Sequence, residues 1–530
     1  MKFYKKYILA AISSAVLLTA CTDRFEGLNE AENGFTDSQL TQDFNHVKAL
    51  FAPMINNVYT YDPAWVTQLQ QNLIGDVYSG YMMPPTPFAS NINNMNYALV
   101  DGWNGFPWST AYSNIMSNAL KVEQRAKESA PQFYAWSLIL KVEAMHRVSD
   151  IYGPLVYSEF GTEETTIPYD SQQDVYNKFF EELDIAINDL TTRVNAGETS
   201  SFTGTDFTLY NGDYTGWIKF ANSLRLRLAM RIVNADPSKA QIEAEKSLSH
   251  SIGVITSNAE SAIVNSSTFT HPLVTINNSW NDIRMGAPME SILKGYDDPR
   301  IENYFETSDI VSGEYKGIRN GIDISDKSDY VVFSPLGNII QTNKITWMTA
   351  AEVYFLRAEG ALRGWNMGGT AESLYEAGIT TSFEQNGAGD ASTYIADNTK
   401  TAIPYVDPLN AVNNINLGDT NLSTITIAWN NGDSNEQKLE KIITQKWIAM
   451  FPDGQEAWSE FRRTGYPKLF PVVINNSGGE ISTEDFIRRI NFPTSEYDGN
   501  PNGVQTGVSY LNGPDTGGTR LWWDISGSNF

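Results

Sequence analysis

Apolar residues recur at helical spacing through much of the chain. Residues Phe133, Trp136, Ile139, Leu140 and Met145 would share a helix face, which predicts a helix over residues 133–148. The same criterion predicts further helices over residues 214–233, 239–250, 349–362, 371–383 and from 434 to about 450. The pattern is that of helix pairs, similar to tetratricopeptide repeats but without a strict period of about 34 residues.

Start and stop signals support these helices. Asp213 can cap the helix that stops before Asp236-Pro237, and capping boxes occur at Thr349–Glu352 and Ser434–Gln437. Five tryptophans fall inside the helical pattern and are expected in the core: Trp136, Trp217, Trp347, Trp447 and Trp458. The sequence therefore predicts a mainly α fold.

Strand signals are few and short. Residues 328–334 and 423–429 alternate as strands do, and we expect small hairpins there. Long stretches rich in Trp, Tyr, Asn and Gly separate the helices, at residues 59–108, 195–212, 268–343 and 386–435. Loops of this length inside a compact domain are usually functional, so we expect ordered surfaces and no internal domain boundary.

The first residues predict a lipoprotein signal peptide. Lys2, Lys5 and Lys6 precede a short apolar stretch at 8–20, well below the roughly 20 residues that a bilayer crossing needs. The stretch ends in Leu18-Thr19-Ala20-Cys21, which is typical of a lipobox, and Cys21 is the single cysteine of the chain. We expect residues 1–20 to be removed, Cys21 to be lipidated, and residues 21–34 to be a polar tether that precedes one domain over 35–530.

Composition and charge narrow the function. Apolar residues make up 41% of the 530 and charged residues only 19%, which indicates a large packed core. The 62 acidic and 37 basic residues give a formal net charge of -25. Nucleic acid and anionic membrane surfaces require a cationic face, so neither is expected as a main partner.

No enzyme signature is present. The four histidines, at 46, 146, 250 and 271, form no zinc motif, and neither a GxSxG elbow nor a Walker loop occurs. Residues 498–503 (DGNPNG) match the first half of a calcium loop, but Ser509 stands at the twelfth position and an Asn/Gly turn is the better interpretation. We predict no catalytic residue, metal or cofactor. A glycosidase with an unmarked carboxylate pair stays open as an alternative.

Several segments carry a family resemblance, in order along the chain. The first is CTDRFEGLNE, which directly follows the lipobox. The others are 149–157 (SDIYGPLVY), 217–231 (WIKFANSLRLRLAMR), 351–359 (AEVYFLRAE), 445–451 (QKWIAMF), 456–467 (EAWSEFRRTGYP) and 488–493 (RRINFP) with Glu496. Together, from residue 21 to about 502, these segments resemble the SusD/RagB family of outer-membrane nutrient-binding lipoproteins of Bacteroidetes.

The resemblance implies a fold and a role. The fold would be a SusD-like scaffold of about four tetratricopeptide-type helix pairs, with long irregular inserts and a few short β-hairpins. The protein would bind oligosaccharides, of host mucin type in our reading, outside the cell for a SusC-like TonB-dependent outer-membrane transporter. It would touch the membrane only through its lipid. A peptide cargo for the same kind of transporter remains an alternative.

The family's ligands are held by the loop after the first helix and by the middle and late inserts. Sugar rings pack on aromatic faces, and their hydroxyls need amide, carboxylate and Arg partners. On this basis the candidate ligand-binding residues are Tyr61, Asp62, Trp65, Tyr81, Asn94, Tyr97, Trp280, Arg284 and Tyr296, of which Trp65 and Trp280 are the preferred pair. Arg225, Arg227 and Arg231 are interpreted as a solvated or ion-paired structural face.

Overall fold

The computed structural model describes residues 42–164, 166–266 and 268–530. The predicted signal peptide, the lipidation site Cys21 and the tether 21–34 lie outside the described residues. Residues 42–49 contain η1 (Gln42–Phe44) and α4 (Asn45–Lys48). Residues Leu50–Phe530 form one compact unit, in which all features below are found.

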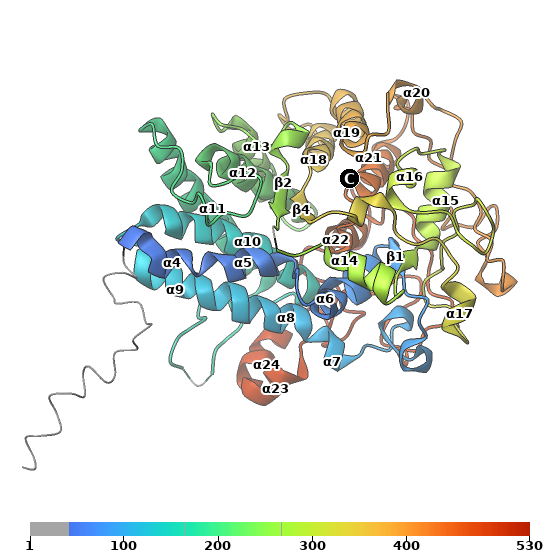
Figure 1. Cartoon of the computed structure of the whole chain (residues 1–530), viewed down its shortest axis with the longest axis horizontal. Coiled ribbons are helices and arrows are strands. Elements are labelled where there is room, and N and C mark those ends of the chain that lie inside the picture. The colour runs from blue at the N-terminus through green and yellow to red at the C-terminus, as the bar shows by residue number, and fades with distance from the viewer. Residues whose placement is uncertain (1–41, 165, 267) are drawn as a thin grey trace, which may run out of the picture. The chain divides into compact units, whose positions relative to one another are not determined.

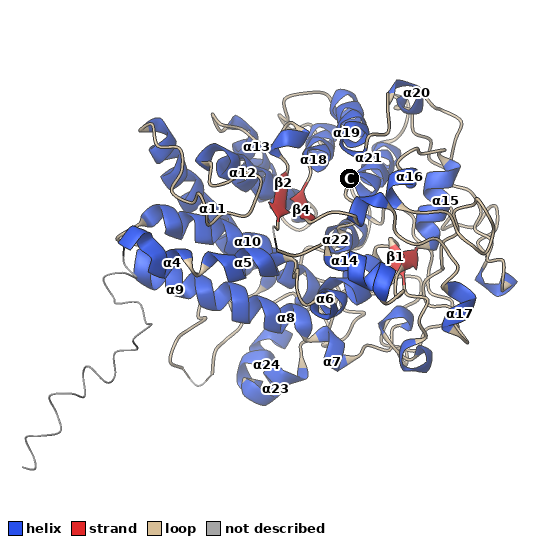
Figure 2. Cartoon of the chain, viewed as in Figure 1, coloured by secondary structure: helices blue, strands red, loops and turns tan. Residues whose placement is uncertain are grey.

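Long helices that follow one another in the chain pack side by side within this unit, as the helical pattern predicts (Figures 1 and 2). Helix α10 packs on α9 and α11, α12 on α11 and α13, α18 on α19 and α21, and α21 on α22. Their bounds are α9 Ser117–Ala126, α10 Pro131–Tyr152, α11 Gln172–Asn195, α12 Tyr214–Arg231, α13 Pro237–Ser249, α18 Ala350–Leu362, α19 Ala371–Asn386, α21 Asn435–Ala449 and α22 Gly454–Thr464.

Short helices occupy the segments between the long pairs. They are α5 Phe51–Val58, α6 Ala64–Thr67, η2 Gln68–Asp76, η3 Phe88–Asn91, η4 Asn94–Asn96, α7 Asp101–Asn104, α8 Phe106–Ala111, η5 Tyr112–Met116, η6 Asn258–Glu260, α14 Pro272–Val274, η7 Thr275–Ser279, α15 Ala287–Gly295, α16 Ile301–Tyr304, α17 Lys327–Tyr330, η8 Asn338–Ile340, α20 Ser392–Ile395, η9 Ala411–Asn413, α23 Thr494–Gly499 and α24 Pro501–Ser509. Three of the four stretches expected as ordered surfaces, 59–108, 268–343 and 386–435, thus contain short helices, whereas the fourth, 195–212, consists of turns and irregular structure.

Side-chain caps start the long helices where the sequence predicts. The Asp213 carboxylate accepts from the backbone N–H groups of Thr215 and Gly216, and Thr349 accepts from Glu352. Ser434 and Gln437 form the complete capping box that opens α21. Each cap satisfies helix N–H groups that have no partner inside the helix.

The core contains the five tryptophans expected there, all buried. Trp136 stacks between Phe51 and Phe202, with ring centroids 4.1 and 4.3 Å away. Trp217 meets Trp136 edge-on at 5.5 Å. These contacts bind α5 and the loop before α12 to helices α10 and α12, so aromatic packing joins the start of the unit to its helix pairs.

Two small antiparallel sheets were not predicted. Strand β1 (Met82–Met83) pairs with β3 (Arg284–Met285), and β2 (Ala262–Asn265) pairs with β4 (Lys344–Met348). Each pair joins residues far apart in the chain, so no local hairpin signal announces it. The β1–β3 pair ties the loop after η2 to the segment that follows η7.

The prediction of hairpin strands at residues 328–334 and 423–429 is wrong. Residues 328–334 begin instead as the helical turn α17, because the Asp326 carboxylate accepts from the Ser328 N–H and caps it. Residues 423–429 form no strand because side chains from other segments donate hydrogen bonds to their backbone carbonyl oxygens. Tyr296 and Tyr375 donate to Ile425 and Ile427, and Lys441 donates to Thr426 and Ala428. Donors from neighbouring helices replace a strand partner.

Residues 498–503 form the junction of α23 and α24, not the predicted loop turn. The Asn500 side chain both donates to the Ile167 carbonyl at 2.7 Å and accepts from the Ile167 N–H at 3.2 Å. Among the described residues no group of three or more His, Cys, Asp or Glu side chains could hold a metal ion.

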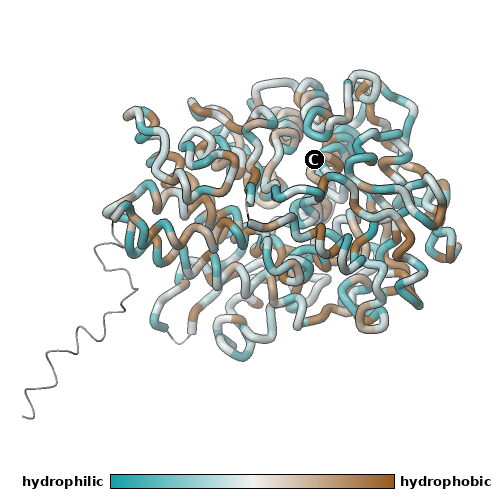
Figure 3. The backbone as a smooth tube through the Cα atoms, viewed as in Figure 1, coloured by the Kyte–Doolittle hydropathy of each residue, from teal (hydrophilic) through white to brown (hydrophobic). Residues whose placement is uncertain are grey.

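Hydrophobic and hydrophilic residues alternate along the helices without a long apolar run (Figure 3). None of the described helices has the length and apolar character needed to cross a membrane.

Candidate functional site

Trp65 is presented to solvent by the short helix α6. Its side chain is 46% exposed, although Trp is a residue that folding usually buries. The Phe106 ring meets it edge-on, with centroids 5.3 Å apart and an interplanar angle of 87°. This contact helps to fix the indole, while nearly half of the side chain remains accessible to solvent. The neighbouring Asp62 is also exposed.

Trp280, which directly follows η7, is the second partly exposed tryptophan of this region. Its carbonyl oxygen accepts from the Lys327 ammonium at 2.7 Å, and the same ammonium pairs with Asp282 at 2.7 Å. Asp282 also accepts from the Thr86 hydroxyl and lies 3.5 Å from the Gln68 amide nitrogen. Three separate segments therefore hold the Trp280 loop in place.

The elements that carry the two tryptophans pack against each other. Helix α6 contacts both η7 and α14, and α6 and α14 lie side by side near the centre of the view in Figure 1. Phe88 and Trp103, both half-buried, form another edge contact nearby in the chain, with centroids 5.7 Å apart. We call the partly exposed rings of Trp65, Trp280, Phe106, Phe88 and Trp103 the aromatic face.

Six other predicted site residues are buried, which corrects the expectation that their side chains line a surface: Tyr61, Tyr81, Asn94, Tyr97, Arg284 and Tyr296. Most donate hydrogen bonds to distant backbone. Tyr61 reaches the Val264 carbonyl at 3.0 Å, Tyr81 reaches Trp447, and Tyr296 reaches Ile425 at 3.1 Å. The hydrogen-bond donors of these side chains are paired inside the protein, so the side chains support the loops.

The remaining three of these six residues support the loops locally. The Asn94 amide donates to Asn104 at 2.7 Å, and Tyr97 packs on Tyr78 with centroids 6.3 Å apart. Arg284 donates to the Val331 carbonyl at 2.6 Å and to the Asn281 side chain at 3.1 Å. Arg284 thereby braces the loop next to Trp280. Asp62, Trp65 and Trp280 keep solvent access and stay candidates for ligand contact.

Sequence reasoning missed Phe88, Phe106 and the Lys327–Asp282 pair. The phenylalanines carry no polar group and so gave no sign of ligand binding. Lys327 lies 45 residues from Asp282 in the chain, so their pairing depends on tertiary structure.

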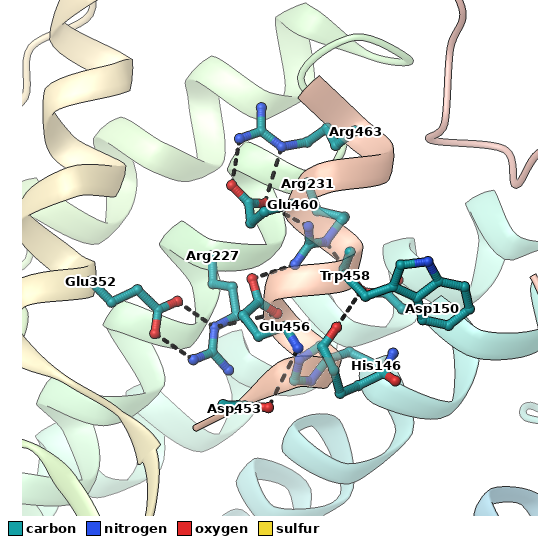
Figure 4. Close-up of polar contacts among 12 residues, drawn as sticks. His146, Asp150, Arg227, Arg231, Glu352, Asp453, Glu456, Trp458, Glu460 and Arg463 are labelled. Carbon is teal, nitrogen blue, oxygen red and sulfur yellow. Dashed lines mark hydrogen bonds and ion pairs between the residues drawn. The ribbon is translucent and has the colours of Figure 1, made fainter. Parts of the chain in front are cut away.

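A buried ionic network lies elsewhere in the unit, among α10, α12, α18 and α22 (Figure 4). Arg227 donates twice to Glu352, at 2.8 and 2.7 Å, and Arg231 pairs with Glu456, Glu460 and Asp150. Arg463 pairs with Glu359 and Glu460 at 2.6 and 2.7 Å. All these side chains are buried. The arginines predicted as a structural face, Arg225, Arg227 and Arg231, are all ion-paired and all buried, so the face is not solvated.

Burial and neighbouring charges shift the pKa values of several groups in this region. Burial raises the pKa of Glu143 to about 8, although Arg227 and Arg147 act to lower it. Burial also lowers the pKa of His146 well below its usual value, so this imidazole stays neutral. Glu456 is equally buried, but Arg231, Arg227 and Lys446 outweigh that effect and bring its pKa to about 2. These carboxylates hold helices together away from solvent.

Comparisons with known proteins agree with this fold. The sequence model of the SusD-like family, described as Susd and RagB outer membrane lipoprotein, matches residues 27–524. No curated protein matches the chain. A chitin-binding SusD homologue from Flavobacterium johnsoniae is 57% identical, with a TM-score of 0.90 over 92% of this chain and 100% of that one.

Two further solved structures are similar over the same extent. A SusD homologue from Bacteroides vulgatus is 39% identical, with a TM-score of 0.85 over 92% of this chain and 100% of its own. A SusD homologue from Bacteroides uniformis is 40% identical, with a TM-score of 0.83 over 91% of this chain and 99% of its own. With its paired helices, folded inserts and nearly full-length family match, the chain belongs to the SusD/RagB family of outer-membrane lipoproteins.

Proposed function

We propose that this protein captures oligosaccharides at the cell surface through its aromatic face. The observation that carries the proposal is the pair of solvent-accessible tryptophans, Trp65 and Trp280, on elements that pack together. The C–H faces of sugar rings pack on such indoles, and nearby exposed Asp62 and Asn278 can serve the hydroxyl groups. The packed scaffold lowers the entropy cost of binding because the rings are already fixed.

Chitin oligosaccharides are the first ligand class to test. The 57% identical relative is a chitin-binding protein, and its identity to this chain extends over its whole length. N-acetylglucosamine units offer apolar ring faces for Trp65 and Trp280, and their acetamide groups can exchange hydrogen bonds with Asn and Asp side chains. Host mucin-type glycans, which share amino sugars, form the second class.

The proposed role includes delivery to a SusC-like TonB-dependent transporter. Lipidation at Cys21 would anchor the protein to the outer membrane, facing the cell exterior, and the transporter would receive the captured chain. The family description as an outer membrane lipoprotein supports the anchor.

Binding without cleavage fits the position of the perturbed carboxyl groups. Burial raises the pKa of Asp76 to about 7 and that of Glu143 to about 8, values that would suit a general acid. Both groups are buried, however, and Asp76 accepts from Asn72, Gln71 and the Gly454 N–H. Neither can reach a glycosidic bond on the surface.

Calorimetric titration of residues 22–530 tests the proposal. The ligands are chitin oligosaccharides, mucin-type oligosaccharides, starch oligosaccharides and mixed peptides, and each mixture is analysed afterwards for shorter products. We expect saturable binding of an amino-sugar oligosaccharide that is recovered intact. Binding of peptides alone would overturn the proposal of a glycan cargo, and the appearance of shorter sugars would reveal a hydrolase.

A further inference from the structure

A hollow that is separate from the aromatic face lies on the described unit, and neither Trp65 nor Trp280 lines it. It has a volume of about 300 Å³ and is formed by β2, η8, β4, the end of α19 and the turn before α22. We call it the amide pocket because Asn303, Asn338, Asn386 and Gln385 contribute to its wall. Cavities that hold small molecules begin at about this size, so one ring-sized ligand would fill it.

The wall offers unused hydrogen-bonding atoms. The Asn303 amide donates to the Asn386 side-chain oxygen at 2.9 Å, which leaves the Asn303 oxygen without a donor among the described residues. The side chains of Asn338, Gln385 and Thr346 make no hydrogen bond within the described part of the chain. A ligand with several hydroxyl groups could satisfy donors and acceptors on this wall at once.

Aromatic rings make the inner part of the pocket. The Tyr59 and His271 rings lie with centroids 5.9 Å apart, and Phe451 contributes a third ring. His271 Nδ1 accepts from the Leu273 N–H at 3.2 Å, so the imidazole proton is placed on Nε2. Burial lowers the pKa of His271 to about 3, which keeps this ring neutral. The pocket wall therefore includes three largely buried aromatic rings, one of them a neutral imidazole.

The Tyr59 hydroxyl is the strongest sign of a missing partner. The residue is 6% exposed, and its buried oxygen has no hydrogen-bond partner among the described residues. A buried polar group left without a partner lowers stability, because it has lost its hydrogen bonds to water and gained none in return. A ligand hydroxyl or carbonyl that reached it would recover this loss.

Charge in the pocket favours an uncharged ligand. Asp453, at the inner end, is already paired with Arg147, with N–O distances of 2.9 and 3.0 Å. Lys344 is the remaining charged side chain of the lining, and it is exposed at the outside. No unpaired buried charge is present among the described lining residues, so nothing there would attract an ion.

We propose that the amide pocket binds a single neutral sugar ring, separately from the aromatic face. The inference rests on the proposed glycan-binding function for the choice of a sugar, but it assigns a second site with its own residues. Tyr59, His271 and Phe451 would contact the ring, and Asn303 and Thr346 would bind its hydroxyl groups.

Saturation-transfer NMR with N-acetylglucosamine and with glucose tests this site on the chain from residue 22. We expect at least one monosaccharide to give saturable transfer, and Tyr59→Phe to weaken its binding about fivefold, as the loss of one hydrogen bond would. Thr346→Gln, which narrows the pocket, should abolish transfer. Thr380→Gln, on the exposed side of α19 outside the pocket, is the matched control and should leave transfer unchanged.

Three outcomes would overturn the second site. One is monosaccharide transfer that disappears in Trp65→Ala and Trp280→Ala but persists in Tyr59→Phe and Thr346→Gln. Another is the absence of any monosaccharide transfer. The third is a crystal soaked in sugar that shows only water in the pocket. Oligosaccharide titration of the same variants keeps the two proposals apart, because the aromatic face should still bind longer chains if the pocket does not bind sugar.

Discussion

Lys327 forms an ion pair with Asp282, with Nζ 2.7 Å from a carboxylate oxygen. The same ammonium donates to the carbonyl oxygen of Trp280, so one side chain fixes both the loop and the tryptophan that it presents. The loop is thus held before any ligand arrives, and preorganisation of this kind lowers the free-energy cost of binding.

Lys327→Met should weaken oligosaccharide binding about threefold to fivefold, because the Trp280 loop loses the ion pair and the hydrogen bond that hold it. The melting temperature should change little, since the pair is partly exposed. Lys294→Met is the matched control: Lys294 pairs with Glu314, also at 2.7 Å, and its hydrogen bonds and ion pairs among the described residues do not reach the Trp280 loop. Calorimetry that shows equal loss in both variants would argue against a positioning role for Lys327.

Trp65→Ala and Trp280→Ala should each reduce oligosaccharide affinity about threefold to tenfold, the range expected for one aromatic contact. Trp65→Phe should retain part of the affinity, since a flat ring remains. Tyr510→Ala removes another half-exposed ring, on the surface after α24, and should leave titration curves unchanged. Unchanged affinity in both tryptophan variants would move the glycan site elsewhere.

The helical part of the fold could be predicted because its signals are local. The caps at Asp213, Thr349 and Ser434 lie within three residues of the N–H groups that they satisfy, so the sequence contains both partners. The strands β2 and β4 could not be predicted in this way, because about 80 residues separate them and each is paired only through the tertiary fold.

The candidate site was predicted only in part for the same reason. Tyr61 and Trp65 look alike in sequence, as aromatic residues of one polar loop. The Tyr61 hydroxyl bonds to Val264, 203 residues away, and is buried, whereas Trp65 projects from α6. Nothing local distinguishes the two. Likewise the helical spacing of Arg227 and Arg231 shows a shared face, but the acidic partners that bury this face come from α18 and α22.

Arg231→Met should destabilise the fold by about 3–5 kcal/mol, because Glu456 and Glu460 would be left as buried charges without this partner. Denaturant unfolding measures the change. Lys178→Met breaks the exposed pair with Glu181 and should cost less than about 1 kcal/mol. Similar losses in the two variants would mean that the buried network contributes no more than a surface pair.

Glu143→Gln should change the pH dependence of stability. The pKa of Glu143 is raised to about 8 by burial, so between about pH 5 and 8 the folded state holds a proton that the unfolded state has lost. Stability from this group is therefore present at low pH and is lost as pH rises toward 8. The nearby Arg227, with a nitrogen 3.6 Å from the Glu143 carboxylate, and Arg147 lower the pKa of Glu143, whereas Asp453 and Glu456 raise it. The neutral His146 ring lies 3.9 Å from the same carboxylate.

Denaturant unfolding of wild type and Glu143→Gln from pH 5 to 9 isolates this group. The variant should gain stability relative to wild type as pH rises to about 8, and the difference should then level off. Glu123→Gln, at a half-exposed position on α9, is the control for the loss of one acidic side chain. A difference that does not change with pH would mean that Glu143 is ionised in the folded protein throughout.

Salt dependence can separate a neutral glycan from a charged peptide cargo. The chain has a formal net charge of -25, so a cationic peptide would be attracted over long range and would bind more weakly in salt. A neutral oligosaccharide held by Trp65 and Trp280 feels no such field, because ring stacking involves no net charge.

We therefore expect affinity for chitin or mucin-type oligosaccharides to change less than about twofold between about 50 and 500 mM NaCl, over which the Debye length falls from roughly 14 to 4 Å. Calorimetry at both salt concentrations measures this, with Lys327→Met included because its ion pair is the charged element nearest to Trp280. A steep loss of affinity with salt in the wild type would indicate a charged ligand and would favour the peptide alternative.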